Sequence, residues 1–149
     1  MRDIWVAGHV TKDIVRIAES PAIEMPGGVA HYAAFAYQRL GLATAILTKV
    51  ARDDIEIFLA GLRDAGVHSV VKESAVTTRF ENIYAQGQTG PRTQQVDGVA
   101  APFAARDLAD IGGRCIHLGP LTAGDMPFEF IEAARRNFAC VVLDLQGCL

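Results

Sequence analysis

The chain has 149 residues, of which 50% are apolar and 21% charged, and its formal net charge is −3. This length and composition indicate one domain with a packed core and exclude a disordered segment. Since there is no basic run, we expect neither nucleic acid nor a membrane surface as a partner. No apolar stretch approaches the ~20 residues of a membrane span, and no signal peptide precedes the first strand, so we expect a cytoplasmic protein.

In the N-terminal half, apolar periodicity and glycine positions predict strands that alternate with helices. The opening strand ends at Gly8, and the first long helix begins at a Pro-Gly-Gly sequence and is closed by Gly41. This helix is apolar on nearly all sides, which is typical of a helix buried on most of its surface. The predicted elements are strands over residues 3–8, 13–17 and 43–50, and helices over 26–40 and 53–65.

The segment from residue 67 to residue 99 has a different pattern. Polar and apolar side chains alternate along it, so that Phe80, Asn82 and Tyr84 face one way and their sequence neighbours face the other. Such alternation indicates antiparallel strands with one solvated face. We therefore predict a lid-like β insertion at about residues 68–99.

Strands and helices alternate again in the last third of the chain. The predicted elements are a short helix over residues 107–111, a strand over 115–118, a helix over 127–138 and a strand over 140–145. The fold class is therefore α/β, with a mainly parallel sheet flanked by helices and an antiparallel insertion. The last strand is apolar on both faces, as in the centre of a parallel sheet. We expect residues 1–149 to form a single incomplete domain, the first part of a longer fold.

Several short motifs occur in the order found in one family of kinases. They are the Gly8-x4-Asp13 signal, Pro26-Gly27-Gly28, Arg39-Leu40-Gly41, Val50-x2-Asp53, Thr77-x2-Phe80, and the segments 116–120 and 144–147. Together they resemble the N-terminal half of the ribokinase-like carbohydrate kinases, also called the PfkB family. The resemblance implies the substrate-binding half of an ATP-dependent sugar or nucleoside kinase, which transfers a phosphoryl group to a hydroxyl.

The resemblance places substrate-binding residues at Asp13, Gly27, Gly28 and Tyr32. One carboxylate can accept hydrogen bonds from two adjacent hydroxyls of a sugar, and we expect Asp13 to do so. The glycine pair lets the backbone at a helix start approach an oxygen-rich ligand closely. Tyr32 stands where the family commonly has Asn, and its ring and hydroxyl can stack on a sugar face or bond to it.

Phosphoryl transfer also needs a base and a cradle for the charge that develops. The family supplies them in a late Gly-Ala-Gly-Asp segment, and the nearest equivalent here is Thr122-Ala-Gly-Asp125. Its position directly after residue 120 differs from that of the family, so we interpret Asp125 as part of a helix start. The catalytic residue is therefore unknown. ATP and Mg²⁺ are expected for an intact family member, with no tight binding of either to this chain.

The remaining reactive residues do not point to another chemistry. Neither the three cysteines nor the four histidines have metal-site spacing, so we expect no metal ligands. The alternative function is a non-catalytic module that binds a small molecule or forms a homo-oligomer through the lid strands or open sheet edges. A dinucleotide-binding domain is disfavoured, because the first strand is not followed by Gly-x-Gly-x-x-Gly.

Overall fold

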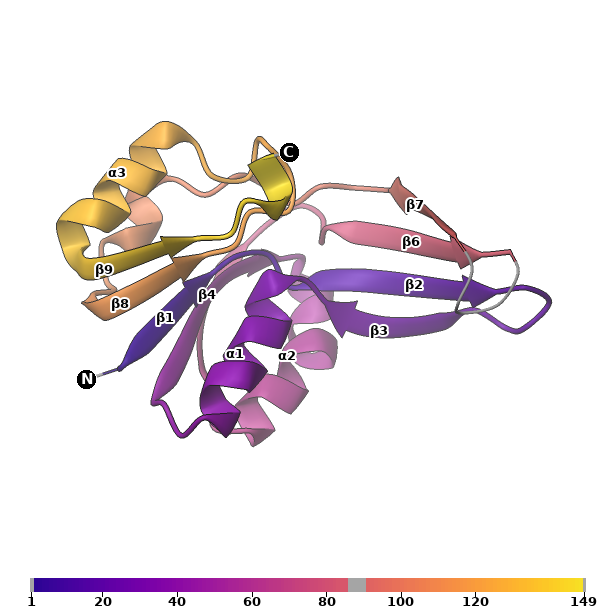
Figure 1. Cartoon of the computed structure of the whole chain (residues 1–149), viewed down its shortest axis with the longest axis horizontal. Helices are drawn as coiled ribbons and strands as arrows, with labels where there is room; N and C mark the ends of the chain where they lie inside the picture. The colour runs from indigo at the N-terminus through magenta and orange to yellow at the C-terminus, as the bar shows by residue number, and fades with distance from the viewer. Residues whose placement is uncertain (1, 86–90, 149) are drawn as a thin grey trace.

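A computed structural model describes residues 2–85 and 91–148. Two sheets build the molecule, and Figure 1 shows one of them projecting from the helix-covered part of the chain. The elements are β1 (Ile4–Ala7), β2 (Thr11–Ile17), β3 (Ile23–Gly27), α1 (Val29–Arg39), β4 (Thr44–Val50), α2 (Ile55–Asp64), β5 (His68–Glu73), β6 (Arg79–Tyr84), β7 (Arg92–Val96), β8 (Gly113–Leu118), α3 (Phe128–Asn137) and β9 (Phe138–Leu143), with short 3₁₀ turns at Arg52–Asp54, Ala105–Leu108 and Gln146–Cys148.

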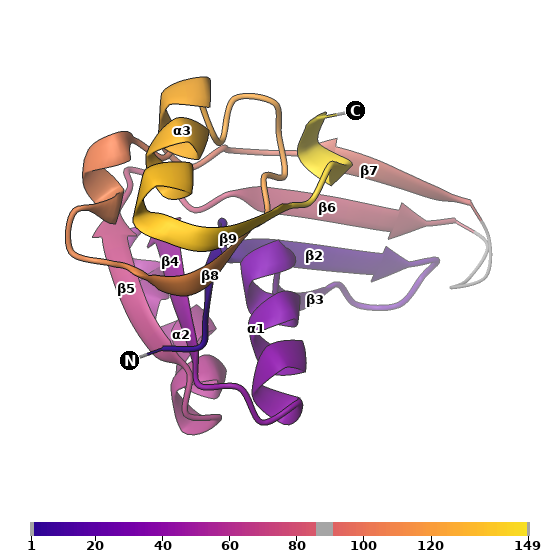
Figure 2. The ribbon, with the colours of Figure 1, turned by 60° about the vertical axis from the view of Figure 1, so that its left-hand side comes forward.

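The larger sheet is parallel and has the strand order β5-β4-β1-β8-β9. The predicted mainly parallel α/β sheet is confirmed, since β4, β1, β8 and β9 lie side by side. Helix α3 covers one face, while α1 and α2 cover the other, as Figures 1 and 2 show. Because successive side chains of a strand point to opposite faces, β1 contributes Trp5 and Ala7 to the α3 side and Val6 to the α1 side.

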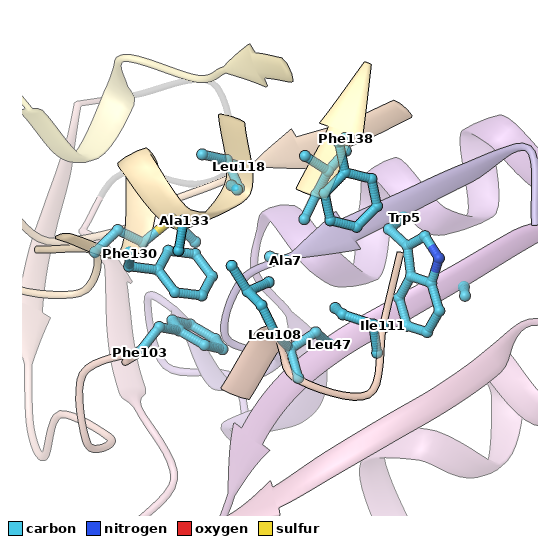
Figure 3. Close-up of a cluster of buried hydrophobic side chains, with 14 residues drawn as sticks. Trp5, Ala7, Leu47, Phe103, Leu108, Ile111, Leu118, Phe130, Ala133 and Phe138 are labelled. Atoms are coloured by element: carbon cyan, nitrogen blue, oxygen red, sulfur yellow. The ribbon is translucent and has the colours of Figure 1, made fainter. Parts of the chain in front are cut away.

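Each face of the parallel sheet carries its own apolar core. On the α3 side, the rings of Phe103, Phe130 and Phe138 pack with Trp5 and with aliphatic side chains of the central strands (Figure 3). On the α1 side, small residues such as Ala30 and Ala34 let the helix lie close to the sheet. Full burial of one large apolar side chain is worth about 1.5–3 kcal/mol, so these two clusters hold the sheet and its loops in place.

The smaller sheet, which we call the lid, has the strand order β3-β2-β6-β7. Its β2–β3 and β6–β7 pairs are antiparallel, whereas β2 and β6 are parallel. The predicted boundary at residue 68 was wrong, because β5 pairs with β4 in the parallel sheet and the lid takes its other two strands from residues 11–27. Strand β3 was missed, since the glycine pair that marks the helix start also ends this strand.

Strand β9 lies at an edge of the parallel sheet as described, rather than at its centre. Its apolar side chains Phe138 and Val141 pack on the α3 side of the sheet, whereas Val142 and Leu143 are exposed. In the described ranges 2–85 and 91–148, the helices are too short and too polar to cross a membrane.

Candidate functional site

A cavity of about 590 Å³ lies between the lid and the carboxyl ends of β8 and β9. This volume is within the usual range for small-molecule sites. Its walls combine the start of α1, the inner face of the lid and the loops that follow β8 and β9. The lining residues are Thr11, Asp13, Gly28, Val29, Tyr32, Ala33, Phe80, Asn82, Arg92, Gln94, His117, Leu121, Asp144 and Gln146.

The inner face of the lid is built from side chains that lie in register across its strands. Asp13 on β2 is opposite Met25 on β3 and Phe80 on β6, and Phe80 is opposite Val96 on β7. In a neighbouring row, the Asn82 side-chain oxygen accepts a hydrogen bond of 2.9 Å from Gln94. The lid therefore contributes the Asp13 carboxylate and the Asn82–Gln94 amide pair to the cavity, beside the ring of Phe80.

The carboxylate of Asp13 is held in one position by its neighbours. Thr11 Oγ1 donates to Asp13 Oδ1 at 2.7 Å, and no described residue donates to Oδ2. Gly27, in register with Thr11 on the adjacent strand, lies directly behind the carboxylate: a Cβ at this position would be 2.2 Å from Oδ2. Gly27 thus does not line the cavity but makes room for the group that does.

Gly28 forms the junction between β3 and α1 and borders the cavity. Its φ of 87° and ψ of 161° belong to a backbone region that is essentially restricted to glycine. A Cβ here would lie 2.3 Å from the His9 carbonyl oxygen, so this junction packs tightly against the loop after β1. One turn later Tyr32 is 55% exposed beside the same cavity. The structure therefore brings Asp13, Gly28 and Tyr32 to one cavity.

Burial has opposite consequences for the two kinds of titratable group here. It raises the pKa of Asp13, and the hydrogen bond from Thr11 and the charge of Arg92 offset part of this effect. It lowers the pKa of His117, and the nearby Asp144 carboxylate opposes that shift. Because its pKa is lowered, the His117 imidazole is neutral at pH 7, and the cavity also holds the side chains of Asp13, Arg92 and Asp144.

Several polar residues of the cavity were not identified from the sequence, namely Asn82, Arg92, Gln94, His117, Asp144 and Gln146. For two of them a signal existed. His117 and Asp144 lie at the carboxyl ends of adjacent parallel strands, where α/β folds commonly bind ligands. The lid residues are brought in by strand pairing between distant segments, which no local pattern reveals.

The segment that resembles a catalytic loop is used for structure. Asp125 is 2% exposed and accepts hydrogen bonds from the backbone N–H groups of Leu121 and Thr122, and His9 Nδ1 is 3.4 Å from its Oδ2. Burial raises the pKa of Asp125, but hydrogen bonds from His9 and Thr122 outweigh it and lower the pKa to about 2. Helix α3 starts after Pro127, so Asp125 fixes the preceding loop and does not cap the helix.

The Asp125 carboxylate accepts these hydrogen bonds and is not among the residues that line the cavity, so this loop does not supply a proton acceptor to a ligand there. In the part of the chain that the structure describes, no three His, Cys, Asp or Glu side chains cluster as a metal site. Cys115 and Cys140 are in register on β8 and β9 as free thiols, away from the cavity lining.

Comparison with solved structures gives extensive similarity. A pyrophosphate-dependent kinase of the ribokinase family, in complex with a pyrophosphate analogue and myo-inositol, is 34% identical, with a TM-score of 0.82 over 97% of this chain and 49% of that one. A pyrophosphate-dependent myo-inositol-1 kinase converted into a myo-inositol-3 kinase is 32% identical, with a TM-score of 0.82 over 97% of this chain and 48% of that one. The ribokinase of Thermotoga maritima is 18% identical, with a TM-score of 0.72 over 99% and 54% of the two chains, which shows a shared fold.

This chain therefore spans about half the length of the kinases it matches. No family model and no curated protein matches the sequence.

Proposed function

From the finding that this chain corresponds to an N-terminal portion of ribokinase-family kinases, we propose that its cavity is the acceptor site of a carbohydrate or cyclitol kinase. The ligand is a small neutral polyol, bound through its hydroxyls. Of the relatives above 30% identity, one is described in complex with myo-inositol and another as a myo-inositol kinase, which favours a cyclic polyol over a nucleoside.

One observation carries this proposal: the Asp13 carboxylate is fixed at the cavity wall with Oδ2 left without a donor among the described residues. Adjacent hydroxyls of a polyol would donate to this group. Hydrogen bonds to a charged acceptor contribute about 1.5–3 kcal/mol, more than neutral ones. The exposed Tyr32 ring and the half-buried Phe80 ring add apolar surface for the C–H face of the ligand.

We further propose that these residues bind the acceptor without transferring a phosphoryl group. For the whole protein, ATP with Mg²⁺ and pyrophosphate are the two donors to compare, since both of these relatives are described as pyrophosphate-dependent. The loop that resembles a catalytic segment has its carboxylate occupied by hydrogen bonds. The purified chain should therefore form no phosphorylated product with either donor and a panel of polyols. Turnover on the scale of ~1 s⁻¹ would refute this part of the proposal.

The acceptor site is tested by titrating the 149-residue chain with myo-inositol, ribose, fructose and adenosine, using calorimetry or NMR. We expect millimolar affinity for a polyol, about −4 kcal/mol. Asp13→Asn should weaken binding at least tenfold, because it removes the charge that accepts the hydroxyls. The matched control is Asp110→Asn, since Asp110 is exposed and outside the cavity. Equal affinity in the two variants would contradict the site assignment.

A second candidate is self-association through the lid. On the inner face, Ile23 (55%) and Met25 (39%) of β3 and Val96 (49%) of β7 are exposed, so apolar side chains lie at both edges of the lid. Two lids placed face to face would cover these side chains. Light scattering should then detect a dimer in the native chain and a monomer in Ile23→Lys. A monomer at all concentrations would exclude this candidate and leave the acceptor site untouched.

A further inference from the structure

His117 lies on the face of β8 that α1 covers, next in register to Val6 of β1. Tyr37 of α1 reaches it: the Tyr37 hydroxyl oxygen and His117 Nδ1 are 3.1 Å apart, and the two ring planes meet at 77°. This contact fixes the rotation of the imidazole ring. The direction of its second nitrogen, Nε2, is therefore fixed as well.

Nε2 is the ring nitrogen of His117 that the contact with Tyr37 leaves available. Nδ1 is occupied by Tyr37, and no hydrogen bond within the described residues involves Nε2. Nor is Nε2 among the buried polar atoms that lack a partner, so it remains accessible to solvent. His117 is half-buried and lines the cavity together with Val29 and Asp144, so the accessible edge of its ring is the cavity edge.

The hydrogen bond to Tyr37 also selects the tautomer. A phenol O–H is a better donor to an imidazole nitrogen than an imidazole N–H is to a phenol oxygen, because the phenol is a weak acid and the neutral imidazole a weak base. With Tyr37 donating to Nδ1, the proton of the neutral ring is on Nε2. Burial lowers the pKa of His117, although Asp144 opposes this shift, so the ring is neutral at pH 7.

We propose that His117 is a second acceptor-binding residue, whose Nε2–H donates to a hydroxyl oxygen of the polyol while Asp13 accepts from hydroxyls at the lid. This inference rests on the proposed function and deepens it. Asp13 stands on β2 of the lid and His117 at the end of β8, so the two residues contact the ligand from different walls of the cavity. Tyr37 is a positioning residue, because it acts through His117.

The two contacts have a consequence for specificity. A hydroxyl can both donate and accept, but a ligand that engages both walls needs hydroxyls on well-separated carbons in a fixed relative geometry. A rigid ring keeps this geometry at no entropic cost, whereas a flexible chain must lose conformational freedom to reach it. The site therefore selects cyclic polyols over acyclic ones of similar size, such as a six-carbon sugar alcohol.

Three measurements on the purified chain test this assignment. The first uses ¹⁵N-edited NMR to determine the tautomer of His117 and to monitor its ring resonances during titration with myo-inositol. The second is the affinity of His117→Phe, which keeps an aromatic ring and removes the donor. The third is Tyr37→Phe, which keeps the ring of Tyr37 and removes the hydroxyl that holds Nδ1. His68→Phe is the matched control, because His68 lies on β5, outside the cavity lining.

We expect native His117 to carry its proton on Nε2, with its ring resonances shifted by the ligand. Loss of one neutral hydrogen bond predicts about three- to tenfold weaker binding in His117→Phe. Tyr37→Phe should redistribute the tautomers of His117 and weaken polyol binding less than His117→Phe does. The control His68→Phe should change neither the His117 tautomer nor the affinity. The preference for myo-inositol over sorbitol should decrease in His117→Phe.

The outcomes separate the two proposals. If Asp13→Asn loses binding while His117→Phe binds as the native chain does, the assignment of His117 is overturned and the acceptor site stands. If His117→Phe fails to fold, the native titration decides: ring resonances that do not respond to a bound polyol overturn the assignment. If the native chain binds no polyol, the proposed function and this inference are both overturned.

Discussion

Replacement of Gly27 by alanine tests how the lid positions the Asp13 carboxylate. An alanine Cβ at this position would lie 2.2 Å from Asp13 Oδ2 and 2.6 Å from Asp13 Cγ, far inside van der Waals contact. The three atoms nearest to that Cβ all belong to Asp13, so the side chain of Asp13 must move. Its movement breaks the 2.7 Å hydrogen bond from Thr11 and withdraws the carboxylate from its place at the cavity wall.

The size of the effect follows from these contacts. Inserting a methyl group into a tightly packed site typically costs about 1–3 kcal/mol, and the lost hydrogen bond to a charged group has a similar magnitude. Since the clash is relieved by the movement that breaks the bond, the two costs overlap, and we expect Gly27→Ala to lower the free energy of unfolding by about 2 kcal/mol. In an Asp13→Ala background the clashing atoms are absent, and the same substitution should cost less than about 0.5 kcal/mol.

Urea unfolding of the native chain, both single variants and the double variant gives the coupling energy directly. The control is Gly124→Ala, because a Cβ there meets no atom within 4 Å. We expect a coupling of at least about 1.5 kcal/mol, together with loss of polyol binding in Gly27→Ala. An equal cost of Gly27→Ala in the presence and absence of the Asp13 carboxylate would refute the reasoning.

Three other predictions concern the framework of the site. Gly28→Ala should cost at least about 3 kcal/mol in urea unfolding, because it combines a glycine-only backbone conformation with a Cβ 2.3 Å from the His9 carbonyl oxygen. In the native chain, Lys49 Nζ lies 2.8 Å from the buried carboxylate of Asp107. Lys49→Met should lower the free energy of unfolding by about 3–5 kcal/mol, because it leaves this carboxylate buried without a cation. Adding Asp107→Leu should restore much of the lost stability. Asp125 has a native pKa of about 2 against an ordinary value of 3.8, so it stabilises the fold by about 2 kcal/mol above pH 4 and loses this contribution as the pH falls toward 2. Unfolding measured at pH 5, 4 and 3 should therefore show a shallower decline for Asp125→Asn than for the native chain, and parallel declines would contradict this role.

Much of the fold was predictable because local patterns coincide with the final contacts. The four strands of the parallel sheet that were predicted are apolar on both faces or nearly so, and they lie side by side as expected. Segments whose strand pairing depends on distant residues were harder to predict from the sequence. Residues 68–73 read as part of the lid, yet β5 pairs with β4 because its half-buried side chains pack against the cores on either face.

The residues of the candidate site likewise fall into two groups, those that local motifs identified and those that only the tertiary structure reveals. Asp13, Gly28 and Tyr32 were identified from motifs within one short stretch, and the structure places all three at the cavity. The role of Gly27 could not be predicted from local sequence, because it depends on the position of a carboxylate on the neighbouring strand. His117 was considered only as a metal ligand and set aside, since nothing in its own segment indicates that Tyr37 contacts one side of its ring or that the residue lines the cavity.

The sequence by itself determined the element types, the alternation that produces a parallel sheet, and the glycines at which strands and helices end. These properties arise from side-chain periodicity and backbone freedom, which act over a few residues. Only the tertiary structure decided the strand partners of the lid, the hydrogen bonds that the Asp125 carboxylate accepts and the polar lining of the cavity. These depend on residues tens of positions apart, and their proximity is set by the packing of two sheets rather than by any local preference.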